Sequence, residues 1–142
     1  MKIWFDMDGT IADLYAVNGW LADLKARNTR PYEEAEPMVD TLALASFLND
    51  AKAHGHEIGI ISWTAKNAPT EYNARVALAK REWLARMLPT VTWDTIRIVE
   101  YGTDKRTATG GGILFDDEEP NRNAWGRGAY EPREMFAVLA RV

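Results

Sequence analysis

Short apolar runs alternate with segments of helical spacing along this chain, and this alternation restricts its fold more than any other feature. Strands are expected over residues 2–5, 57–61, 96–99 and 113–115. Between and after them, apolar residues recur every three or four positions, which predicts helices over residues 15–27, 38–53, 70–87, 119–125 and 132–139. Such an alternation predicts an α/β fold, with helices on both faces of a parallel central sheet.

Several details of the helices and loops can be predicted in the same way. Residues 28–37 contain two prolines and several charges and are expected to form a loop. Thr70 is a candidate N-cap, and Gly110 to Gly112 predict a tight turn before the last strand. One face of the helix over residues 38–53 is expected to carry Met38, Leu42, Ala45 and Leu48.

Composition limits the class of protein. A length of 142 residues predicts one domain with a substantial core. The absence of cysteine excludes disulfides, thiolate metal sites and a cysteine nucleophile. The net charge of −4 argues against strong non-specific binding to nucleic acid. No apolar run reaches membrane-spanning length, and Lys2 leads directly into a strand, so we expect a cytoplasmic protein without a membrane partner.

Polar side chains stand directly at the ends of three predicted strands, and Lys105 follows the fourth, residues 96–99, after a short glycine-containing loop. Ligands of parallel α/β sheets bind at this carboxyl edge. If the strands are neighbours, four carboxylates, one hydroxyl and one ammonium meet there, from Asp6 and Asp8, Ser62, Lys105, and Asp116 and Asp117. Like charges at close range disfavour one another's ionisation. A hard divalent cation resolves this conflict, and an all-oxygen ligand set suits Mg²⁺.

These residues, in this order, resemble the four motifs of the haloacid dehalogenase (HAD) superfamily of phosphotransferases. The motifs are Asp6-x-Asp8-Gly9-Thr10, Ser62, Lys105 and Asp116-Asp117, and the resemblance runs from residue 3 to about residue 121. It implies a Rossmann-like three-layer sandwich with a minimal or absent cap. It also implies that residues 1–142 form a single HAD-like catalytic domain.

The resemblance further implies a role for each motif residue. Asp6 would be the nucleophile, and Asp8 would protonate the leaving oxygen and then activate water. Thr10 would hold Asp8 in place. Mg²⁺ would be bound by the Asp6 carboxylate, the Asp8 backbone carbonyl, and Asp116 or Asp117. Ser62, Thr10, Lys105 and Met7 would bind the phosphate, and Lys105 would also offset the charge on Asp6. Dehalogenase members lack the second aspartate, so Asp8 favours phosphate chemistry.

Two stretches narrow the resemblance toward nucleotide phosphates. Residues 104–107 and 113–117 with Pro120-Asn121 resemble the 5′(3′)-deoxyribonucleotidase branch, and the short spacing from Lys105 to Asp116 leaves little room for a helix between them. The segment that runs from Ser62 through Pro69-Thr70 resembles the phosphatase domain of phage polynucleotide kinases, with Tyr72, Arg75, Lys80 and Trp83. We therefore expect a nucleotide or a nucleic-acid end as substrate.

The region between the first motif and the next core helix is short. Deoxyribonucleotidases insert a helical cap here, whereas this chain has residues 11–38 for a minimal cap-region insert, enough for one helix and a loop. We therefore expect an open site that suits a bulky substrate. Candidates for its rim are Trp63, Lys66, Arg75 and Trp125.

Other interpretations of these residues are open or excluded. Thr64 competes with Ser62, and Lys66 competes with Lys105. A calcium loop that starts at Asp6 fails, because its twelfth position is Val17. A phospho-accepting receiver or binding module without turnover is an alternative, and so is a HAD phosphotransferase on a non-nucleotide substrate. The motifs leave the oligomeric state open.

Overall fold

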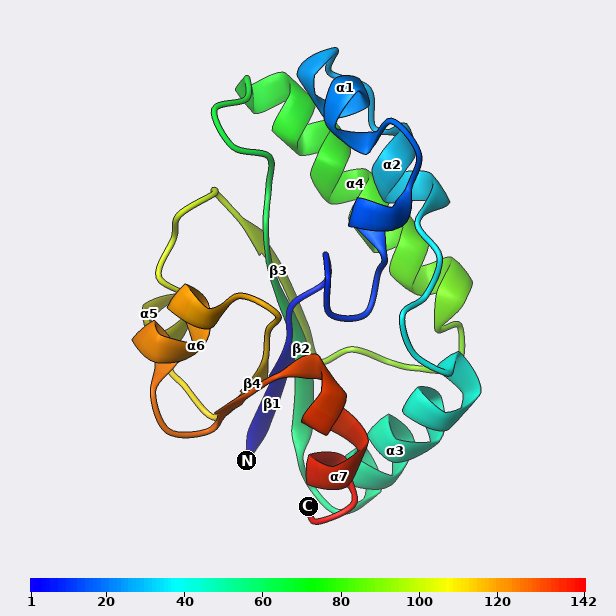
Figure 1. Ribbon diagram of the computed structural model, residues 1–142. Coiled ribbons are helices and arrows are strands. Elements are labelled where there is room, and N and C mark those ends of the chain that lie inside the picture. Colours follow the sequence, from blue (N-terminus) through cyan, green and yellow to red (C-terminus); the bar gives the residue numbers. More distant parts are fainter.

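The computed structural model describes residues 1–142 and has a five-stranded, all-parallel sheet at its centre (Figure 1). The strands lie in the order β3-β2-β1-β4-β5. Their bounds are Lys2–Phe5 (β1), Glu57–Trp63 (β2), Thr95–Val99 (β3), Ile113–Phe115 (β4) and Ala129–Tyr130 (β5). The predicted α/β fold is confirmed. The two-residue β5 was not predicted, because so short a strand has no periodicity to read.

Helices cover both faces of the sheet (Figure 1). α3, α4 and α7 lie on one side, and α5 and α6 on the other. The α-helices span Trp20–Lys25 (α1), Arg30–Glu34 (α2), Thr41–Ala53 (α3), Thr70–Met87 (α4), Lys105–Thr109 (α5), Glu119–Trp125 (α6) and Met135–Leu139 (α7). Two 3₁₀ turns span Leu14–Ala16 (η1) and Pro132–Glu134 (η2). The result is a three-layer sandwich.

Alternating side chains of the strands build two cores. Ile3 and Phe5 of β1 point into the larger core, where they join residues of α3, α4 and α7 such as Trp83. Trp4 points to the opposite face and packs with Leu114 and Trp125. Strands buried on both faces lack the polar alternation of a half-exposed sheet, which is why they read as continuous apolar runs.

Position 59 of β2 has room only for glycine, because of the Trp4 side chain on the neighbouring strand. Gly59 pairs with Trp4 of β1, and the Trp4 ring fills the space that a side chain at position 59 would occupy. Large and small residues thus alternate across two adjacent strands, which keeps this layer closely packed.

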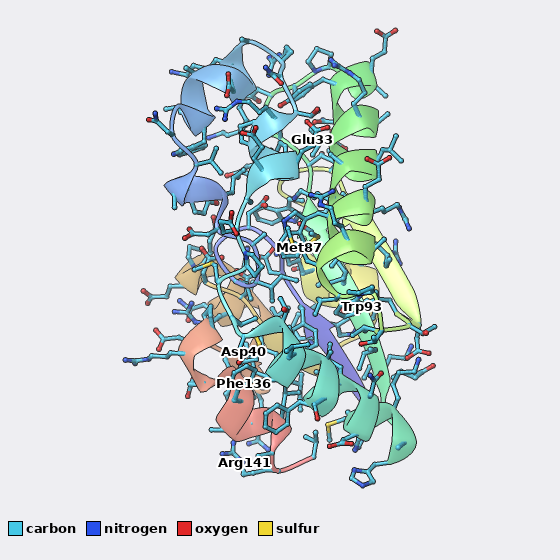
Figure 2. The ribbon with its side chains drawn as sticks, turned by 90° about the vertical axis from the view of Figure 1, so that its right-hand side faces the viewer. Glu33, Asp40, Met87, Trp93, Phe136 and Arg141 are labelled. Carbon is cyan, nitrogen blue, oxygen red and sulfur yellow. The ribbon has the colours of Figure 1, made fainter.

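Residues 11–38 form η1, α1 and α2, which lie beside α4 at the carboxyl edge of the sheet (Figures 1 and 2). A separate apolar cluster joins them to α4, and it includes Leu14, Tyr32, Tyr72 and Val76. Trp83 donates its indole N–H to the carbonyl oxygen of Ala35 at 2.8 Å. The insert is thereby fixed beside α4 at the carboxyl edge of the sheet.

The insert differs from its prediction in two places. The helix predicted over residues 15–27 is interrupted at Gly19, which adopts a positive φ of 74°, and α1 therefore begins only at Trp20. The predicted loop over residues 28–37 contains α2, whose Pro31 lies in the first turn. Proline is tolerated there, because the N–H groups of the first turn have no helical acceptor.

Two helix starts also differ. α3 begins at Thr41, where the Asp40 carboxylate caps it by accepting from the N–H groups of Leu42 and Ala43. Leu42 is 84 % exposed, and Met38 is 44 % exposed and lies before the helix, so the predicted apolar face was wrong at these two positions. Thr70 is the first residue of α4 and not its cap, which is Pro69.

No helix of the structure is both long enough and apolar enough to cross a membrane.

Candidate functional site

The strand order reverses between β1 and β4, and two acidic pairs stand at this point. Asp6 and Asp8 follow β1, and Asp116 and Asp117 follow β4. The Asp6 N–H donates to the Phe115 carbonyl at 2.9 Å, so strand pairing continues into the cluster. In open parallel sheets the ligand crevice lies outside the carboxyl ends of the strands at such a switch point.

Lys105 lies between two buried carboxylates. Its Nζ is 2.9 Å from Asp6 Oδ1 and 2.7 Å from Asp116 Oδ2. Lys105 is the first residue of α5, which the spacing of the sequence was expected to exclude and which is only five residues long. Burial lowers the Lys105 pKa, but the charges of Asp6 and Asp116 outweigh burial and raise it above its ordinary value. The side chain is therefore a permanent cation.

Three carboxylates converge beside this ammonium. Asp6, Asp116 and Asp117 each offer one oxygen, and these oxygens lie within 4.8 Å of one another. The Thr10 hydroxyl is 3.2 Å from Asp6 Oδ2 and 3.3 Å from Asp117 Oδ1, and it accepts from the Asp117 N–H. The expectation that Thr10 holds Asp8 was wrong, since the hydrogen-bond partners of Thr10 are Asp6 and Asp117.

The electrostatics of the cluster favour a bound cation. Burial and the nearby charge of Asp6 raise the pKa of Asp116 to about 6 and that of Asp117 to about 8. Without a further positive charge, the cluster retains protons near neutral pH. The convergent, all-oxygen donor set fits Mg²⁺. The Asp8 carboxylate is outside the cluster, which leaves the Asp8 backbone carbonyl as its only possible ligand.

Gly9 explains how the two acidic segments approach so closely. Its φ of 80° lies in the region that glycine alone adopts without strain. A side chain at position 9 would also collide with the Asp117 carboxylate. Glycine therefore allows both the turn after Asp8 and the approach of Asp117.

Asp8 and Ser62 share a partner that the sequence did not identify as functional. Lys80 of α4 is only 1 % exposed, and its Nζ lies 2.8 Å from Asp8 Oδ2 and 2.8 Å from Ser62 Oγ. Burial raises the pKa of Asp8, and the charge of Lys80 partly offsets this. The spacing of Val76, Lys80 and Trp83 placed Lys80 on the buried face of α4, and this signal could have identified it.

A cleft of about 400 Å³ lies over these residues, and Asp6, Asp8, Ser62 and Lys105 all line it. The insert supplies one wall, including Tyr15 and Trp20, and the opposite wall carries Trp63 and Tyr101, whose ring centroids are 4.8 Å apart. Besides Lys105, three further cations line the same cleft, namely Lys25, Arg27 and Lys66. The cleft thus joins an acidic floor to aromatic walls with a cationic rim.

The remaining candidates are divided between this cleft and other regions. Thr64 lines the cleft with a buried hydroxyl that has no hydrogen-bond partner, so it still competes with Ser62. The Met7 side chain is buried in the core, so only its backbone could reach a phosphate. Two rim candidates were wrong. Arg75 lies over the Tyr72 ring, and Trp125 is buried under the sheet and donates to the carbonyl of Gly112.

Comparison with known proteins identifies a similar fold and no family. No protein-family model and no curated protein matches the sequence. The crystal structure of D,D-heptose 1,7-bisphosphate phosphatase from Burkholderia Thailandensis matches with a TM-score of 0.57 at 10 % identity. The match covers 99 % of this chain and 96 % of that chain. The likeness confirms the α/β fold over the full length, and the roles of individual residues depend on the geometry above.

Proposed function

We propose that this protein is a Mg²⁺-dependent phosphomonoesterase that acts through a phospho-aspartate on Asp6. The observation that carries the proposal is that the four carboxylates of the site have two different environments. Asp6, Asp116 and Asp117 form one oxygen cluster, while Asp8 stands apart on Lys80. The HAD-like motifs and a fold shared with a known phosphatase support the same activity.

The chemistry assigns one task to each group. An Asp6 carboxylate oxygen attacks phosphorus, the ester P–O bond breaks, and Asp8 gives a proton to the departing oxygen. Asp8 then takes a proton from a water molecule that attacks the phospho-aspartate, which releases inorganic phosphate and restores Asp6. Lys105 and the Ser62 hydroxyl bind the phosphoryl oxygens. Bound Mg²⁺, held by Asp6, the Asp8 carbonyl and Asp116 or Asp117, would supply charge neutralisation.

The walls of the cleft favour a nucleotide end as substrate. Trp63 and Tyr101 offer ring surfaces on which a base can stack, and each stacked base contributes about 1–3 kcal/mol in comparable sites. Lys25, Arg27 and Lys66 are placed to meet further phosphates. A polynucleotide end carries both a base and further phosphates, whereas a sugar monophosphate carries neither and a sugar bisphosphate carries only a further phosphate.

The strand order argues against the receiver alternative. Receiver domains have a flavodoxin-like sheet in the order 2-1-3-4-5, whereas this sheet has the order 3-2-1-4-5. Labelling with acetyl phosphate separates the two functions directly. Rapid loss of the label is expected of the enzyme, and a label that persists for hours would favour a phospho-accepting module.

A phosphate-release screen with and without Mg²⁺ tests the proposal. It should cover mononucleotides, oligonucleotides with 5′- or 3′-phosphates, sugar phosphates and p-nitrophenyl phosphate. Asp6→Asn should reduce turnover to background, while Asp50→Asn, an exposed aspartate on α3, should have no effect. Full turnover by Asp6→Asn would refute the assignment of the nucleophile, and full activity in a chelator would refute the metal. Preference for a sugar phosphate would favour the non-nucleotide alternative.

A further inference from the structure

Lys80 has no role in the chemistry described above, although it is buried at the centre of the site. We propose that Lys80 is a positioning residue that aims the Asp8 carboxylate and the Ser62 hydroxyl at the phosphoryl group. The inference rests on the proposed phosphatase function.

The three hydrogens of the Lys80 ammonium are fully committed. Lys80 donates to Asp8 Oδ2 at 2.8 Å, to Ser62 Oγ at 2.8 Å and to the Trp63 carbonyl at 2.7 Å. An ammonium has three donors and no acceptor. None therefore remains for a substrate, so Lys80 acts through its neighbours and not on the phosphate itself.

This arrangement determines where the Ser62 hydroxyl can point. Its oxygen accepts from Lys80, and its own hydrogen has no acceptor in the protein. Ser62 lines the cleft, so the free O–H is available to a phosphoryl oxygen. Without Lys80, no contact in the protein holds the Ser62 hydroxyl in this orientation.

The same contact orients Asp8. Lys80 holds Oδ2, whereas Oδ1 makes no hydrogen bond within the protein. The Asp8 side chain is 18 % exposed and lines the cleft. One oxygen is thus anchored, and the other is presented to the leaving oxygen and then to water.

Packing alone does not account for a lysine at this position. Its neighbours on the buried face of α4 are apolar, including Val76, Trp83 and Leu84. Burying an ammonium costs several kcal/mol, and well-packed apolar residues often replace buried ion pairs without loss of stability. A methionine of similar length would fill the same space, so the charge and its three donors point to the site.

The test compares Lys80→Met with Lys52→Met. Lys52 is the matched control, because it makes the same kind of contacts with a carboxylate and a carbonyl, Asp94 Oδ1 and Thr92 O, both at 2.8 Å and away from the cleft. With p-nitrophenyl phosphate and saturating Mg²⁺, Lys80→Met should lower kcat about 10- to 100-fold, since positioned acid–base groups contribute about 10²–10⁴-fold. KM should change less than about threefold, because Lys105 still binds the phosphoryl group. Lys52→Met should retain the kcat of the parent.

A double variant distinguishes positioning from general destabilisation. If Lys80 acts partly through Ser62, then Lys80→Met and Ser62→Ala should combine to less than the product of their separate effects on kcat/KM. Simple multiplication of the two effects would overturn the inference, as would an unchanged kcat in Lys80→Met. Should Lys80→Met fail to fold, Lys80→Gln takes its place. Its uncharged amide has two N–H donors for three acceptors, so kcat should still fall, and an unchanged kcat would overturn the inference. A parent protein without phosphatase activity would overturn the proposed function and this inference together.

Discussion

Removing the ammonium of Lys105 is expected to destabilise the metal-free protein severely. Lys105→Met leaves the carboxylates of Asp6 and Asp116 without their common partner. The two residues are 7 % and 0 % exposed, so water cannot replace the lost contact. The stability of the site therefore depends on this one positive charge whenever no cation is bound.

The distances give the magnitude. At 2.7–2.9 Å and an effective dielectric constant of about 20, each contact is worth roughly 6 kcal/mol before desolvation. The two contacts together amount to roughly 12 kcal/mol. Relief of the desolvation of the ammonium and proton uptake by the carboxylates offset most of this, and breaking a buried ion pair usually costs about 3–5 kcal/mol net. Proteins of this size have about 5–15 kcal/mol of stability in total. The variant should therefore be close to unfolding at neutral pH.

Guanidinium unfolding at pH 7 measures this loss, with a chelator and with saturating Mg²⁺. Mg²⁺ should restore much of the stability of Lys105→Met but not its turnover, because the cation replaces the charge and not the contact with phosphate that the proposed function gives to Lys105. Lys52→Met serves as the control. Its ion pair with Asp94 is about one-third exposed and should contribute less than about 1 kcal/mol. Equal losses in the two variants, or no response to Mg²⁺, would refute the electrostatic reasoning.

Three further predictions concern the cluster and the cleft. Because Asp116 and Asp117 have folded-state pKa values of about 6 and 8, above their ordinary 3.8, the folded metal-free protein binds more protons than the unfolded chain. Its thermal midpoint should therefore fall as pH rises from 4 to 8, and Mg²⁺ should remove this decline. Gly9→Ala should raise the Mg²⁺ concentration for half-maximal activity about tenfold or more in a metal titration, because the added methyl group displaces Asp117. Tyr101→Ala should raise KM for a phosphorylated oligonucleotide about 5- to 100-fold, while KM for p-nitrophenyl phosphate stays unchanged.

The sequence was sufficient to predict the positions of the motif residues because their placement follows from the sheet. The residue that follows a parallel strand lies at the carboxyl edge of the sheet, independently of where the helices begin and end. Asp6, Asp8 and Asp116 therefore follow from the ends of two apolar runs. Lys105 was harder to place, since β3 lies at the edge of the sheet and the chain must cross β2 to bring Lys105 to Asp6.

The sequence did not reveal the role of Lys80, because the groups that Lys80 contacts lie far from it in the sequence. Within α4, the spacing of Val76, Lys80 and Trp83 indicates that Lys80 faces the core, but it does not show which groups the ammonium contacts there. Its burial is offset by Asp8, 72 positions away, and by Ser62 and the Trp63 carbonyl on β2. The helices α2 and α5 were not predicted, because a helix of five residues is too short to show a helical periodicity.

The balance of charge at the site limits which substrate it can hold. In the proposed mechanism Asp8 carries the proton that it gives to the leaving oxygen when the substrate binds. The other three carboxylates, of Asp6, Asp116 and Asp117, together with the ammoniums of Lys80 and Lys105, then give a formal charge of −1 when ionised. One divalent cation would turn this into +1, so a phosphoryl dianion would meet a weakly positive floor. Any further phosphate of the substrate would lie beyond this floor, where the three cations of the rim, Lys25, Arg27 and Lys66, line the cleft. Under the proposed function, a monophosphate would leave these cations unused, whereas a polynucleotide end would engage them. The affinity of the correct substrate should therefore weaken with added salt more steeply than that of a mononucleotide.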